Sequence, residues 1–168
     1  MGIAFVACQA FINRVWNQVR DLNKTCLRDY GRPLPSLASR QEVLQVEGSK
    51  LVGSSITNIE AIYAVGNYWK HSEEWPTCEV VADDRRRYVW DIGKMPPIQK
   101  PTAEVVSEMG LRFGSTGNLR TAARALGVSD YCDLRAIRQT LDSWITQLLS
   151  VTQAGVHQLA RKSKKRIS

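Results

Sequence analysis

The stretch ITNIEAIYAVGNYWKHSEEWP, residues 56–76, decides the fold, because it joins a hydrophobic helix to the densest cluster of chemically active side chains in the chain. Apolar residues recur along it at steps of three and four, which predicts a helix with one broad buried face. Pro76 disfavours helix at the residue before it. We therefore expect a helix that begins near Leu51 or Ser54, ends near His71 and carries a polar patch at its end.

Two more long helices are predicted on either side of this stretch. The first spans Ile3 to Arg28, and the second begins at Ser129 or Asp130 as its cap and runs on toward His157. In both, apolar residues recur at helical spacing with polar residues between them. The stripes comprise Val6, Cys8, Phe11, Ile12, Val15, Trp16, Val19, Leu22 and Cys26 in the first, and Leu134, Ile137, Leu141, Trp144, Ile145 and Leu148 in the second.

Shorter helices are predicted between the long ones. One lies around residues 39–46, where Ser39 and Glu42 have the spacing of a capping box. A second starts with Thr102 as its N-cap, and a third spans residues 118–126 and is closed by Gly127 as a left-handed C-cap. Within the central helix, Gly66 permits close approach by a neighbouring helix.

These stripes predict an all-α helical bundle, because each apolar face needs a partner. We expect one domain over residues 1–155, followed by a basic tail over residues 156–168. Residues 77–100 have a different character, with two β-leaning pieces around a charged run. A long irregular loop or a marginal hairpin is favoured there over a sheet, because a lone two-stranded hairpin has little to bury.

Composition places the chain among soluble globular proteins, with 168 residues, 43% hydrophobic and 23% charged. No apolar run approaches the roughly 18 to 20 residues needed to span a bilayer, so we expect no membrane partner. The apolar N-terminal stretch lacks the basic region of a signal peptide, which favours the cytoplasm. The four scattered cysteines form no CxxC pair and are expected to be free thiols.

The formal net charge of +7 is concentrated near the C-terminus. No acidic residue follows Asp142, whereas five basic residues do so close to the end, so the rest of the chain is nearly neutral. Such a segment can bind nucleic-acid phosphates through counterion release, or it can be a solvated terminal run. The five residues are Arg161, Lys162, Lys164, Lys165 and Arg166.

Several chemistries have no motif in this sequence. There is neither a GxxxxGK phosphate loop, nor a GxGxxG fingerprint, nor a GxSxG nucleophile elbow. The two histidines lie far apart and no carboxylate motif pairs with either, which argues against a metal site. We therefore expect neither a cofactor nor a metal.

The candidate catalytic residues are Asn67, Lys70 and His71. Asn67 and His71 are four residues apart and project from the same side of the predicted helix. An imidazole titrates near neutrality and an ammonium stabilises developing phosphorane charge, so metal-free RNA cleavage could use this set. The alternative is structural: a polar helix end balanced by Glu73 and Glu74, with the neighbouring tryptophans in the core.

A helical bundle carrying NYWKHSEEW at residues 67–75 resembles the HEPN superfamily, small all-α domains of ribonuclease toxins, antiphage systems and nucleic-acid-associated proteins. Active members pair an arginine with a histidine four to six residues later and act as dimers. The resemblance implies a metal-independent ribonuclease in toxin-antitoxin or phage-defence biology, with His71 as the histidine and Asn67 as the neighbouring polar residue. Val65 and Gly66 occupy the places of the arginine.

A second resemblance lies at residues 117–129, GNLRTAARALGVS, which is similar to helix-turn-helix segments of bacterial regulators. It implies a turn at Gly127 and a recognition helix in which Arg135 and Arg138 contact guanine or phosphate. Three functions therefore stay open: a HEPN-like protein acting on or through RNA or a protein partner, a DNA-binding regulator, and a non-catalytic interaction or immunity protein. A homodimer is compatible with each of them.

Overall fold

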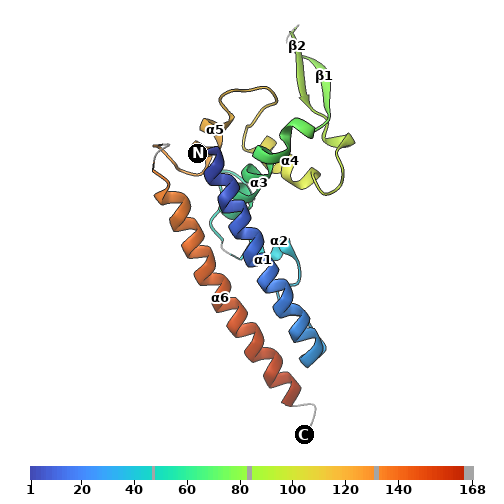
Figure 1. Cartoon of the computed structure of the whole chain (residues 1–168), viewed down its shortest axis with the longest axis vertical. Helices are drawn as coiled ribbons and strands as arrows, with labels where there is room; N and C mark the ends of the chain where they lie inside the picture. Colours follow the sequence, from blue (N-terminus) through green and yellow to red (C-terminus); the bar gives the residue numbers. More distant parts are fainter. Residues whose placement is uncertain (47, 83–84, 131–132, 165–168) are drawn as a thin grey trace.

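A computed structural model describes residues 1–46, 48–82, 85–130 and 133–164. Figure 1 shows two long helices, α1 and α6, that extend along the molecule, while the shorter elements gather toward one end and a β-hairpin projects from them. In chain order the elements are α1 (Gly2–Tyr30), α2 (Arg40–Leu44), α3 (Asn58–His71), β1 (Thr77–Ala82), β2 (Arg85–Trp90), α4 (Lys100–Glu108), α5 (Asn118–Ala125) and α6 (Arg135–Lys164), with 3₁₀ turns η1 (Ser72–Glu74) and η2 (Ile92–Lys94). The mainly helical character that was predicted is confirmed, but the fold is not purely all-α, because β1 and β2 form a two-stranded sheet.

The α3 helix is central, because it packs against α1, α4 and α6. Gly66 allows α1 to approach closely: a Cβ at this position would lie 2.4 Å from Gln9 Cβ and 2.7 Å from the Phe5 carbonyl oxygen. Trp144 of α6 is completely buried, and its indole Nε1 donates to the Val43 carbonyl at 2.8 Å. Most of the apolar stripe residues of the long helices thus meet in one core, but Phe11 and Leu134, which were predicted to belong to these stripes, are exposed.

The boundaries of α3 and α2 are set by side-chain caps. Thr57 caps α3 and forms a capping box with Glu60, so the helix begins at Asn58 and not near Leu51 or Ser54 as predicted. The chain before it turns through Gly53, whose φ is 75°. The predicted capping box of Ser39 with its partner three residues later is present at the start of α2, and the predicted end of α3 at residue 71 is also confirmed.

Two predicted caps are wrong. The α4 helix begins at Lys100 with a proline in its first turn, and Thr102 is buried inside the helix. The α6 helix begins at Arg135 and not after Ser129 or Asp130.

Asp133 lies two residues before the start of α6 at Arg135. Its Oδ1 accepts a hydrogen bond from the Arg135 backbone N–H at 2.9 Å. Hydrogen bonds from the Arg135 guanidinium and backbone hold the pKa of the Asp133 carboxyl below its usual value. At its other end α6 continues without a break past residue 155 to Lys164.

The segment near residues 77–100 forms a hairpin, not a long loop. β1 and β2 pair antiparallel from Thr77 opposite Trp90 to Ala82 opposite Arg85. An aromatic cluster anchors its base, with the rings of Tyr68, Trp75 and Trp90 packed edge to face at centroid distances of 5.3–5.8 Å. Outward from this base the described side chains of β2 are exposed, and Asp83 and Asp84 of the charged run lie outside the described residues.

Two further predictions concern membrane-spanning helices and thiols. Within the described ranges, no helix combines the length and the apolar character that crossing a bilayer requires. Cys8, Cys26 and Cys78 are free, while Cys132 lies outside the part of the chain that the structure describes. Burial raises the pKa of the Cys8 and Cys26 thiols.

Candidate functional site

A groove of about 720 Å³ lies between α2, α3 and α4, and we call it the α3 groove. One face of α3 lines its length at helical spacing, from Glu60 to His71. These eleven steps correspond to about 16 Å, or three helical turns. α4 runs antiparallel to α3 on the other side, because Ser54 Oγ donates to Glu108 at 2.5 Å near one end and Asn67 Nδ2 donates to Thr102 Oγ1 at 3.4 Å near the other.

Apolar side chains supply much of the surface of the α3 groove. Ile98 is 84% exposed, which is unusual for an isoleucine and leaves it open to a partner. The buried Trp75 closes the same end as His71. The apolar lining comprises Leu44, Ile56, Ala64, Trp75, Ile98, Pro101 and Val105.

The charges that line the α3 groove are mainly negative. Four glutamates stand against one permanently charged cation, Arg40. The Arg40 guanidinium is itself held at the side of the groove: its Nη1 donates to Tyr63 Oη at 2.7 Å, and its Cζ lies 5.6 Å from the centre of the Tyr63 ring. The glutamates are Glu60, Glu74, Glu104 and Glu108.

The structure brings two of the three predicted catalytic residues to the groove. Asn67 and His71 line it together, as their spacing predicted, but Lys70 does not. The Lys70 Nζ donates to Gln9 Oε1 on α1 at 2.8 Å. The His71 Nδ1 lies 3.4 Å from Glu74 Oε1, and the side chain is about half exposed.

Asn67 serves mainly to join three helices. Its Oδ1 accepts from Gln9 Nε2 of α1 at 2.6 Å, and its amide nitrogen donates to Thr102 of α4. Gln9 therefore bridges Asn67 and Lys70, and it is 96% buried, with 4% exposed. Sequence reasoning missed Gln9, although a glutamine between Phe5 and Ile12 on the apolar stripe of a helix was a signal for a buried polar contact.

The predicted nucleic-acid contacts that the structure describes lie in two separate places along α6. Arg135 forms hydrogen bonds with Asp133, and Arg138 Nε lies 3.5 Å from Asp142 Oδ2. Arg161 and Lys162 lie exposed 23 residues farther along α6, about 35 Å away along the helix. The side chain of Lys164 and residues Lys165 and Arg166 lie outside the described residues.

The segment that resembles a helix-turn-helix has a long connection. The predicted helix and its left-handed Gly127 are confirmed, with φ of 72°. However, nine residues, 126–134, separate α5 from α6, whereas the turn of a helix-turn-helix has three or four. This spacing does not favour docking of α6 as a recognition helix.

Comparison of the chain with family models, curated proteins and solved structures gives no match. Across the described ranges, no three His, Cys, Asp or Glu side chains are placed to hold a metal ion together. The function therefore has to be argued from the α3 groove itself.

Proposed function

We propose that this protein is an interaction module whose α3 groove binds an amphipathic helix of a protein partner, with an apolar stripe and basic flanks. The observation that carries this proposal is an apolar groove about three helical turns long, lined by four glutamates in a chain with a formal net charge of +7. Helices commonly dock by laying an apolar face into such a groove. Charges of opposite sign would steer the partner and fix its orientation.

The same charges disfavour RNA in this groove. A phosphate close enough to be attacked with the help of His71 would approach Glu74, whose carboxylate is 3.4 Å from the imidazole. Two like charges about 4 Å apart repel by roughly 1 kcal/mol in water and about 4 kcal/mol near a protein surface. Lys70, which would have to offset this repulsion, is hydrogen-bonded to Gln9 on the α1 side.

Two buried polar atoms also suit a partner with hydrogen-bonding groups. Trp75 Nε1 and Gln99 Oε1 belong to side chains that line the groove, and neither atom has a hydrogen-bond partner among the described residues. An unsatisfied buried group costs about 1–3 kcal/mol. A partner that supplies one acceptor and one donor, with a small side-chain adjustment, would recover part of this energy.

Selection from a displayed library of helical peptides of about 15 residues tests the proposal. We expect enriched peptides to carry large apolar residues at positions i, i+4 and i+7 and Lys or Arg beside them. Fluorescence anisotropy should show at least tenfold weaker binding of such a peptide to Glu104→Lys. The matched control is Asp142→Lys, which makes the same charge change on α6 and should bind within twofold of the wild type.

Two results would overturn the proposal. One is evidence against a basic partner helix: either the selected peptides carry no basic residues, or Glu104→Lys leaves the affinity for the selected peptide unchanged. The other is cleavage of total RNA in EDTA that disappears in His71→Ala while the fold is retained, which would support the competing HEPN-like ribonuclease.

A further inference from the structure

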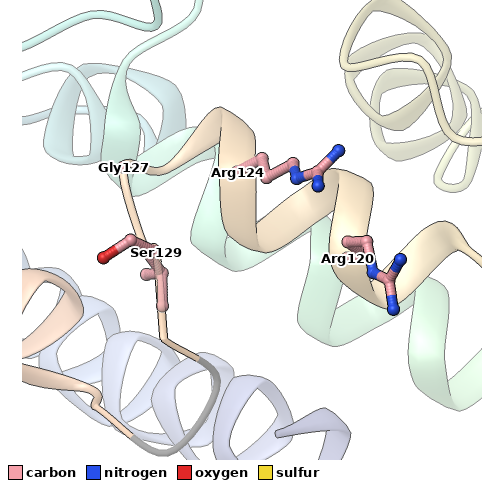
Figure 2. A pocket seen from close by; sticks show the side chains of 5 residues that line it. Arg120, Arg124, Gly127 and Ser129 are labelled. Carbon is pink, nitrogen blue, oxygen red and sulfur yellow. The ribbon is translucent and has the colours of Figure 1, made fainter.

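The end of α5 and the turn after it form a second pocket, separate from the α3 groove. Its volume is about 540 Å³, and we call it the α5 pocket. Figure 2 shows Arg120 and Arg124 extending side by side from one face of α5, with Gly127 and Ser129 beyond the end of the helix. Among the described residues, the lining holds two guanidinium groups and one hydroxyl, and no carboxylate: Arg120, Arg124, Gly127, Val128 and Ser129.

The opposite face of α5 fixes the direction of these arginines. Ala122 and Ala123 are completely buried, and Asn118 is 3% exposed. The Asn118 amide donates to Tyr68 Oη at 2.7 Å and to the Arg112 carbonyl at 2.6 Å. Because residues four apart on a helix share a face, Arg120 and Arg124 are both directed outward from this anchored helix.

The backbone N–H groups at the start of the turn are already used in hydrogen bonds and are not available to a ligand. The N–H groups of Leu126, Gly127 and Val128 all donate to carbonyls of α5. Gly127 adopts φ of 72°, which closes the helix and lets Val128 return to the core at 3% exposure. Ser129 follows directly and also lines the pocket, but Figure 2 shows its hydroxyl pointing away from the two guanidinium groups.

We propose that the α5 pocket binds a phosphate group through the guanidinium groups of Arg120 and Arg124. A guanidinium presents five N–H donors in a planar fork that matches phosphate oxygens, so it can bind an anion while it also bonds within the protein. The phosphate belongs either to a small phosphorylated ligand or to a nucleic-acid backbone.

This site does not depend on the proposed function of the α3 groove. The two surfaces share no lining residue, and their charges are of opposite sign. Either proposal can therefore be disproved without affecting the other.

Titration at low salt tests the α5 pocket with three probes: inorganic phosphate, AMP and a single-stranded 12-mer oligonucleotide. Calorimetry measures affinity, and NMR locates the site through the arginine Nε–Hε signals. We expect Arg120→Ala/Arg124→Ala to lose at least tenfold in affinity. Arg120→Lys/Arg124→Lys keeps the positive charge but removes the planar guanidinium fork. Its affinity should therefore lie between that of the double alanine variant and that of the wild type.

The matched control removes the same charge from another exposed helical surface. Arg14→Ala/Arg20→Ala on α1 should change affinity by less than twofold, and circular dichroism should show an unchanged fold for all variants. If the wild type binds phosphate and AMP and Arg120→Ala/Arg124→Ala does not, the pocket is a small-ligand site. Binding of the oligonucleotide alone identifies a backbone site, and the slope of log K against log salt should then fall by about 1.4 for two lost phosphate contacts.

The proposal is overturned by either of two outcomes. The first is that none of the three probes binds the wild type. The second is that the α5 and α1 double variants lose affinity equally, which would indicate attraction by net charge without a site.

Discussion

Gly66 is the residue on which the contact between α1 and α3 depends most directly. An added Cβ would meet Gln9 Cβ at 2.4 Å and the Phe5 carbonyl oxygen at 2.7 Å, and the second of these is backbone that cannot rotate away. We expect Gly66→Ala to lower the free energy of unfolding by about 1–3 kcal/mol, as overpacking of a core does. Urea denaturation measures this difference.

The control for this change is Gly48→Ala. A Cβ at Gly48 would have no neighbour within 4 Å, so its effect should stay within about 0.5 kcal/mol. Equal midpoints for the wild type and Gly66→Ala would mean that α1 can move away from α3 without loss. The close approach at Gly66 would then not be a determinant of the fold.

The same contact explains how far the candidate site could be predicted. Asn67 and His71 could be placed together because their spacing on a helix is a local property. The partner of Asn67 and Lys70 is Gln9, which lies 58 and 61 residues earlier, and no local pattern pairs these positions. Spacing therefore found two residues of the groove lining, Asn67 and His71, while the hydrogen bonds that hold Asn67 and Lys70 could be found only from the tertiary structure.

At the scale of elements, the hairpin depends on its anchor. Trp90 is 8% exposed and packs on Trp75 and Tyr68, whereas Tyr88, two residues earlier on the same strand, is 60% exposed. A two-stranded hairpin is at best marginally stable alone. We expect Trp90→Ala to cost about 3–5 kcal/mol and to release the hairpin before the helices unfold.

Hydrogen exchange tests this expectation directly. The amides of residues 78–81 and 86–89 should lose protection in Trp90→Ala, while those of α1 and α3 keep theirs. Tyr88→Ala should leave the exchange pattern close to that of the wild type. Retained protection of the strands in Trp90→Ala would show that the hairpin is stable without its anchor.

The elements also show which boundaries a sequence can predict. Ser39 and Glu42 form a local capping box, so the start of α2 could be predicted. Gly127 supplies a left-handed cap, so the end of α5 could be predicted as well. Thr102 has the chemistry of a cap but is buried, because α4 lies against Asn67. The start of α6 was also misplaced, because Ser129 and Asp130 have the chemistry of a cap but lie four and three residues before Asp133, the residue that accepts from the Arg135 backbone N–H.

At the scale of the whole molecule, charge is divided between surfaces. The chain is basic overall, yet the α3 groove is lined mainly by glutamates and the α5 pocket by arginines. The sequence placed the excess positive charge near the C-terminus and left the rest of the chain nearly neutral. The distribution instead supports two partners of opposite charge, a basic helix at one surface and a phosphate at the other.

The extent of the folded domain is the last property of the whole molecule that can be tested. Sequence reasoning placed the end of the domain at residue 155, but α6 continues to Lys164, and Leu159 is 95% buried, with 5% exposed. Chains ending at residues 155 and 163 should therefore differ in stability. The shorter chain loses the burial of Leu159 and should be less stable than the full chain by about 2–5 kcal/mol, as for truncation of a buried leucine.

The chain ending at residue 163 retains Leu159 and loses three basic residues, Lys164, Lys165 and Arg166. Its free energy of unfolding should lie within about 0.5 kcal/mol of that of the full chain, because the residues removed lie beyond Leu159, the last buried side chain of the described residues. Thermal and urea denaturation of the three chains, at one ionic strength, separates burial from charge. If the two truncated chains are equally stable, the end of α6 contributes nothing to the core and the domain does end at residue 155.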